Sequence, residues 1–238
     1  MNILYKELEL FGNVSPCYYK GGETRPKYRG LSHLICFYTI PYIFIYIQYQ
    51  YVTSLIGLLL SCLIMSAMLC LFGISSHYHR LEFKTKEEYT LWSKLDHCSI
   101  SYFIGCGMYP FGFLLMKTNP IQFYLYIGLN SIILLSSLVY NIKKDTVKKQ
   151  TILQLVILSS QAITLFPFLY YIIPLLTYRE IIYISFKYIV QLSGVLIYKY
   201  ELFNCNKDIF GFHEVFHLFT IAGTICSFGF LSTICSRI

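Results

Sequence analysis

The sequence predicts an all-α, polytopic membrane protein built as a bundle of seven transmembrane helices. Of its 238 residues, 56% are hydrophobic and only 13% are charged, against about 25% charged in an ordinary soluble domain. A chain of this length cannot bury so much apolar surface inside a water-soluble core. A spanning helix needs about 20 apolar residues, so the chain accommodates roughly seven helices with short connections.

Seven apolar stretches can be assigned along the chain, and each is long enough to cross a bilayer. They cover residues 31–49, 52–79, 96–116, 120–140, 151–176, 180–200 and 211–234. No linker is long enough to separate two domains, so residues 1–238 are expected to form one membrane domain, with residues 1–30 as a cytosolic N-terminal segment. This segment lacks the apolar region of a cleavable signal peptide, and the first helix is therefore expected to direct membrane insertion.

The positive charges predict the orientation of the bundle. Of the 19 Lys and Arg residues, 15 fall in the N-terminal segment and every second connection, three fall in the remaining connections and the C-terminus, and Lys187 interrupts the sixth stretch. Cytosolic loops carry the excess of Lys and Arg, so the N-terminus is expected in the cytosol and the C-terminus on the opposite side. The net charge of +7 is thus assigned to membrane lipid head groups rather than to nucleic acid.

Five polar residues at the ends of these stretches are candidates for chemistry. His213 and His217 are four residues apart in FGFHEVFHLF, so they share one helical face and suit two ligands of one metal. His79 ends the second stretch, with Ser75 one turn earlier on the same face, and Asp96 opens the third. Each also has an ordinary interpretation: the histidines as interfacial hydrogen-bonding groups, and Asp96 as a helix N-cap.

The predicted topology favours the functional interpretation. The second stretch ends on the cytosolic side, and the third and seventh stretches begin there, so His79, Asp96, His213 and His217 are expected at one membrane depth. Ionisable residues at this depth are costly and mark functional sites. Three imidazoles with an open fourth position are the usual arrangement of a catalytic zinc ion. The site requires the second and seventh helices to be neighbours.

The segment HEVFH also matches the H-E-x-x-H pattern of zinc proteases, in which the Glu is the general base. An intramembrane metalloprotease would require an acidic third ligand downstream, and the 21 residues that follow His217 contain no acid. The motif also leaves His79 and Asp96 unexplained. The competing interpretation makes Glu214 an interfacial acid that points roughly 100° away from His213 around the helix.

Four segments of the chain resemble hemolysin III, the microbial branch of the progestin and adipoQ receptor (PAQR) superfamily. They are RPKYRGLSHLICF, SSHYHR, LDHCSISYFIGCGMYP and FGFHEVFHLFTIAGT, and their order and spacing agree with the family over nearly the whole chain. The family pattern is a Ser four residues before a His, then an Asp, then HxxxH. It falls on Ser75, His79, Asp96, His213 and His217.

The resemblance implies a seven-helix bundle in which three histidines hold Zn²⁺ and the Asp holds a water beside it. Adiponectin receptors, which belong to the same superfamily, are similar to ceramide-cleaving amidases. The leading hypothesis is therefore a zinc-dependent hydrolase of a lipid amide or ester, with Asp96 as general base and Ser75 orienting His79 or the water. The alternative is a membrane-lysing or pore-forming protein with a structural zinc. The short cytosolic connections do not favour a receptor.

Overall fold

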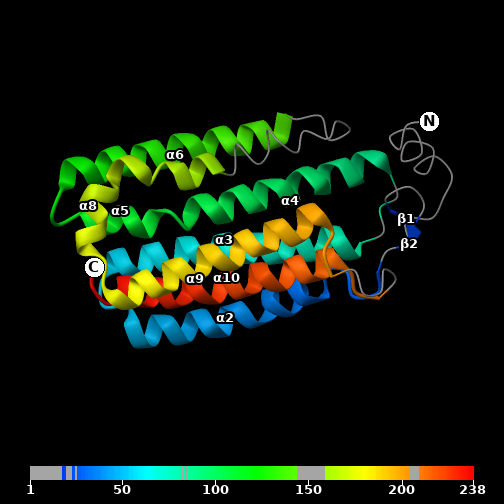
Figure 1. Cartoon of the computed structure of the whole chain (residues 1–238), viewed down its shortest axis with the longest axis horizontal. Helices are drawn as coiled ribbons and strands as arrows, with labels where there is room; N and C mark the ends of the chain where they lie inside the picture. Colours follow the sequence, from blue (N-terminus) through cyan, green and yellow to red (C-terminus); the bar gives the residue numbers. More distant parts are fainter. Residues whose placement is uncertain are drawn as a thin grey trace.

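The computed structural model describes residues 18–19, 23–24, 26–81, 83, 85–143, 159–203 and 209–238. Long helices run side by side along one axis and form an elongated bundle (Figure 1). The α-helices are α2 (Leu31–Tyr51), α3 (Leu55–Arg80), α4 (Lys86–Cys106), α5 (Tyr109–Leu115), α6 (Pro120–Lys143), α8 (Leu169–Ile172), α9 (Tyr178–Tyr200) and α10 (Phe212–Cys235). The two-residue strands β1 (Tyr18–Tyr19) and β2 (Glu23–Thr24) pair antiparallel beside one end of the bundle.

Six segments of the described chain are long and apolar enough to cross a membrane: α2, α3, α6, α9, α10 and the stretch Glu87–Leu115, which joins α4 and α5. A shorter apolar helix, Ser159–Leu175, covers part of the fifth predicted stretch. The remainder of that stretch, residues 151–158, lies outside the described residues, as does nearly all of the segment 1–25. The prediction of a helical bundle is therefore confirmed, and the count of seven spans and the orientation of the termini stay predictions.

Two prolines explain why the fifth stretch is not a continuous helix. Pro167 lies in the 3₁₀ turn η1 (Phe166–Phe168), and Pro174 lies in η2 (Ile173–Leu175), on either side of α8. A proline removes one backbone donor and clashes with the preceding turn, so each one interrupts the regular helix. Pro41, by contrast, lies inside α2 without ending it.

The helix that carries Asp96 begins ten residues earlier than its hydropathy predicts. Thr85 is the N-cap of α4, and its hydroxyl accepts the backbone N–H of Glu88 at 3.2 Å. Two acidic residues in the first turn, Glu87 and Glu88, complement the positive end of the helix. The expectation that Asp96 opens this helix is therefore wrong, and its interpretation as an N-cap is excluded.

Helix packing brings the distant segments of the candidate site to one end of the bundle. α10 packs against α9, α2 and α3, and α3 packs against α2 and α4. The shared core contains fully buried side chains from both α3 and α10, among them Met68, Phe72, Leu231 and Ile234. The prediction that the helices of His79 and His217 are neighbours is confirmed. The last turn of α3 meets the first turns of α10 and α2.

Candidate metal centre

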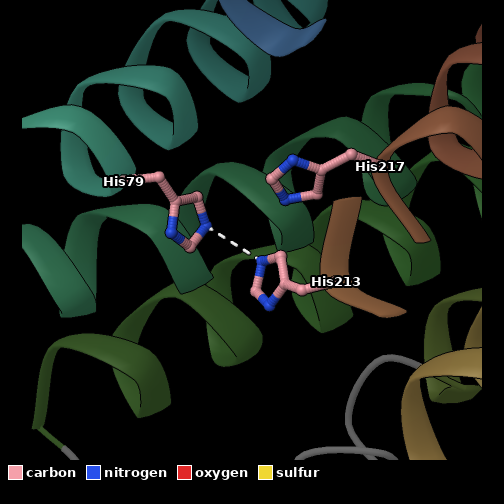
Figure 2. Close-up of side chains that lie close together, drawn as sticks. All are labelled: His79, His213 and His217. Carbon is pink, nitrogen blue, oxygen red and sulfur yellow. Dashed lines mark hydrogen bonds between the residues drawn. The ribbon is translucent and has the colours of Figure 1, made fainter. Parts of the chain in front are cut away.

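The imidazoles of His79, His213 and His217 turn toward a common point (Figure 2). One nitrogen from each ring can be chosen so that all three lie within 4.8 Å of one another. The Nε2 atoms of His79 and His213 are 3.3 Å apart. Two nitrogens bound tetrahedrally at about 2.0–2.1 Å from one zinc ion are separated by about 3.3 Å. The His79–His213 pair therefore has the separation that one zinc ion requires, and the three donors together are close enough to share one metal ion.

The local sequence explains why the three rings meet. His79 lies in the last turn of α3, whereas His213 and His217 occupy successive turns at the start of α10. The spacing of four residues places both α10 rings on the face that packs against α3. His213 and His217 are buried, with 9% and 2% of their surface exposed, and His79 is half-buried. The imidazole of His79 is thus the most accessible of the three.

A glycine at the start of α2 packs directly against His79. Gly30 is the N-cap of α2 and has a φ of 73°, in the left-handed region that favours glycine. A Cβ atom on Gly30 would lie 2.8 Å from the Cβ of His79 and 3.3 Å from the carbonyl oxygen of Ser76. The entry to α2 can approach the end of α3 this closely only because residue 30 has no side chain.

Glu214 lies between the two α10 histidines in sequence but has a different set of contacts. One carboxylate oxygen, Oε2, accepts the backbone N–H of Gly211 at 2.7 Å, and Oε1 forms an ion pair with Nε of Arg29. The side chains of Glu214 and Arg29 are 2% and 5% exposed, so the acid is buried in an ion pair at the start of α10. Its place at the membrane interface stays a prediction. Because both carboxylate oxygens are engaged away from the imidazoles, the geometry argues against Glu214 as the general base of an H-E-x-x-H protease.

Ser75 lies on the helix that carries His79, and Asp96 lies on the helix packed beside it. Ser75 is buried in α3 one turn before His79, and Asp96 is buried on α4, which packs against α3. The Asp96 carboxylate lies within electrostatic range of Tyr78, which directly precedes His79. The cluster of donors found among the described residues consists of the three histidines and does not include Asp96. The roles of Asp96 and Ser75 stay predictions.

Two residues beside the cluster were not predicted as part of the site. In the sequence, Arg29 counted only as one of the positive charges that predict the orientation. The one hint of its role was that a glutamate in the first turn of α10 needs a positively charged partner. His33 lies in the first turn of α2 and stacks on His217, with 3.7 Å between the ring centroids. The only hint in the sequence is that His33 follows Arg29 by four residues. No spacing in the sequence shows that the start of α2 contacts α10.

Comparison with known protein families identifies the family of this chain. A family model described as haemolysin-III related matches residues 22–228. The chain belongs to the haemolysin III family. No curated protein shows a significant match to it. Family membership and the long apolar helices establish this haemolysin III chain as an integral, multi-pass membrane protein. The family is associated with metal, and the three-histidine cluster is the set of residues in this chain that suits one.

Proposed function

We propose that this haemolysin III protein is a zinc-dependent membrane hydrolase that cleaves a lipid amide or ester, as a ceramidase does. The observation that supports the proposal is the convergence of three imidazoles from two helices at one end of the bundle. A set of three nitrogen donors suits a catalytic zinc ion, whereas structural zinc sites have four protein ligands. The described residues offer no fourth His, Cys, Asp or Glu within the same cluster.

In the proposed reaction, His79, His213 and His217 hold the metal as neutral imidazoles. Zinc bound there supplies Lewis-acid polarisation of the substrate carbonyl and lowers the pKa of a water to about 7. Asp96 accepts a proton from the attacking water and passes it to the leaving nitrogen or oxygen. The water oxygen bonds to the carbonyl carbon, the C–N or C–O bond breaks, and the products are a fatty acid and an amine or alcohol. Ser75 orients His79 from the turn below.

The depth of the centre supports a substrate that lies in the membrane. His213 and His217 are the second and sixth residues of α10, so they lie within about 9 Å of the helix end. This is the depth at which the amide or ester of a lipid joins its acyl chain to its head group. With seven spans and a cytosolic N-terminus, the centre faces the cytosolic leaflet.

The proposal is tested with the purified protein in lipid nanodiscs and a ceramide that carries a fluorescent acyl chain. We expect about one zinc per chain by mass spectrometry, and turnover that falls by about 10²–10⁴-fold in Asp96→Asn while zinc is retained. The matched control is His77→Ala, because His77 is an exposed histidine in the same helical turn as His79 that packs on Trp92 instead. Full zinc occupancy without turnover of any lipid amide or ester would refute the hydrolase.

The same preparation separates hydrolysis from membrane lysis. Release of haemoglobin from red cells is measured with wild-type and Asp96→Ala protein. If lysis needs hydrolysis, the variant loses both activities. Lysis at equal rates by the two proteins would instead support a membrane-damaging protein in which the metal only joins α3 to α10.

A further inference from the structure

A fourth imidazole lies against the metal centre. His33, the third residue of α2, is 2% exposed, and its ring lies nearly parallel to that of His217, with an interplanar angle of 15°. Phe72 makes a T-shaped contact with the same ring, with ring centroids 4.9 Å apart at 84°. Neither ring nitrogen of His33 has a hydrogen-bond partner among the residues that the structure describes.

The contacts of His33 distinguish it from the three metal donors. The donor cluster comprises His79, His213 and His217, and His33 is not part of it. A buried imidazole usually satisfies its nitrogens with hydrogen bonds. His33 instead packs its ring against those of His217 and Phe72. The 3.7 Å separation from His217 is that of two aromatic faces in van der Waals contact.

A ring stacked on His217 can restrict the orientation of the His217 imidazole. Rotation about the terminal torsion of a histidine side chain is broad, so rotamer preference does not fix the plane of the ring. The plane decides whether a nitrogen points at the other two donors. The rings of His79 and His213 meet His217 at steep angles, 53° and 74°, so neither lies flat on its face. His33 supplies the parallel contact that prevents the ring from tilting.

We propose that His33 is a positioning residue of the metal centre, whose flat face holds the imidazole of His217 in the plane required for metal binding. The inference rests on the metal centre of the proposed function. It assigns to α2, which contributes no ligand, a direct role in the affinity of the site. The ion pair of Arg29 with Glu214 and the close approach of Gly30 to His79 hold this end of α2 against α10 and α3.

Co²⁺ is the probe, because its visible spectrum reports the geometry of its ligands. The variants are His33→Phe, which keeps a flat ring without nitrogens, and His33→Leu and His33→Gln, which remove the ring. We expect His33→Leu and His33→Gln to weaken Co²⁺ and Zn²⁺ binding by about 10–100-fold, as loss of an orienting partner does, and to alter the Co²⁺ spectrum. His33→Phe is expected to restore both toward wild type. His77→Leu, which removes an imidazole outside the cluster, is the control and should match wild type.

The outcomes separate this inference from the proposed function. If wild-type protein does not bind Co²⁺ or Zn²⁺, the metal centre itself is absent. If wild type binds and the ring-free variants bind equally well with the same spectrum, the positioning role alone is wrong. If His33→Phe is as weak as His33→Leu, the nitrogens matter rather than the face, and stacking is overturned. Thermal unfolding of each metal-free variant separates lost positioning from lost folding, and two ring-free variants guard against failure of one to fold.

Discussion

The two ends of the bundle each carry a glutamate in the first turn of a helix, and each glutamate pairs with an arginine from a distant segment. At the histidine end, defined by His79, His213 and His217, Glu214 of α10 pairs with Arg29. At the opposite end, Glu180 of α9 pairs with Arg237, whose Nη1 lies 2.7 Å from the carboxylate. In both cases the carboxylate also accepts a backbone N–H three residues earlier, at 2.7 Å.

The surroundings of the two ion pairs differ. Arg29 is 5% exposed, whereas Arg237 is 37% exposed near the end of the chain. The ion pair of Arg29 lies on the helix that carries two of the metal donors, and the part of the opposite end that the structure describes holds no comparable cluster. The same capping glutamate and arginine pair therefore secures a helix at each end of the bundle, and the three imidazoles are what distinguish the histidine end.

Removal of one metal donor should have the largest effect and should be confined to the histidine end. His217→Ala is expected to lower zinc affinity by more than about 100-fold, because the loss of a ligand exceeds the 10–100-fold effect of an orienting residue. Zinc content after dialysis against a competing chelator measures this. Arg237→Met, at the opposite end, should retain full zinc. Full retention by His217→Ala would show that the cluster does not bind the metal.

The bundle and the histidine end could be predicted because both follow from local patterns. Apolar stretches mark the spanning helices, and the spacing of His213 and His217 fixes their common face. Charge alternation then placed His79 at the same end. The start of α4 was missed because many of residues 86–95 are polar: the capping hydroxyl of Thr85, rather than hydropathy, marks where the helix begins.

The contacts between helices could not be predicted in the same way. The ion pair of Arg29 with Glu214 and the stack of His33 on His217 depend on where the first turn of α2 docks. The periodicity of α2 does not show which of its residues face α10. Nor could the sequence show that Glu214 is buried, since a charged residue near a helix end is equally compatible with exposure to water.

The second test compares how much each ion pair contributes to the free energy of unfolding. Arg29→Met leaves the buried carboxylate of Glu214 without its partner, and such a change lowers the free energy of unfolding by about 3–5 kcal/mol. Arg237→Met likewise removes the partner of a buried carboxylate, because Glu180 is 0% exposed. Arg237 itself is 37% exposed, so water can reach the vacated position and screen the charge, and the loss should be smaller than that of Arg29→Met. Denaturant unfolding in mixed micelles measures both.

A double variant separates the charge from the packing. Arg29→Met combined with Glu214→Met removes both charges, and much of the lost stability should return, because a matched apolar pair can replace a buried ion pair. Equal losses in the two single variants would mean that burial does not distinguish the two ends. A double variant no more stable than Arg29→Met alone would assign the contribution to packing of the arginine side chain.

Glycines near the two ends provide the smallest and most local test. Gly30→Ala should lower stability by roughly 1–2 kcal/mol, since a left-handed backbone disfavours any Cβ, and it should also weaken zinc binding because the new methyl group displaces His79.

Gly57, near the opposite end, has no positive φ, and its Cβ would lie 3.3 Å from Oγ of Ser54 and 3.4 Å from the carbonyl oxygen of Cys235. Helix propensity favours alanine there by up to about 1 kcal/mol and offsets this tight contact, so Gly57→Ala should change stability little and leave zinc affinity unchanged. Calorimetry and metal competition on both variants test this. A Gly30→Ala protein that loses stability but binds zinc normally would show that α2 supports the fold without positioning His79.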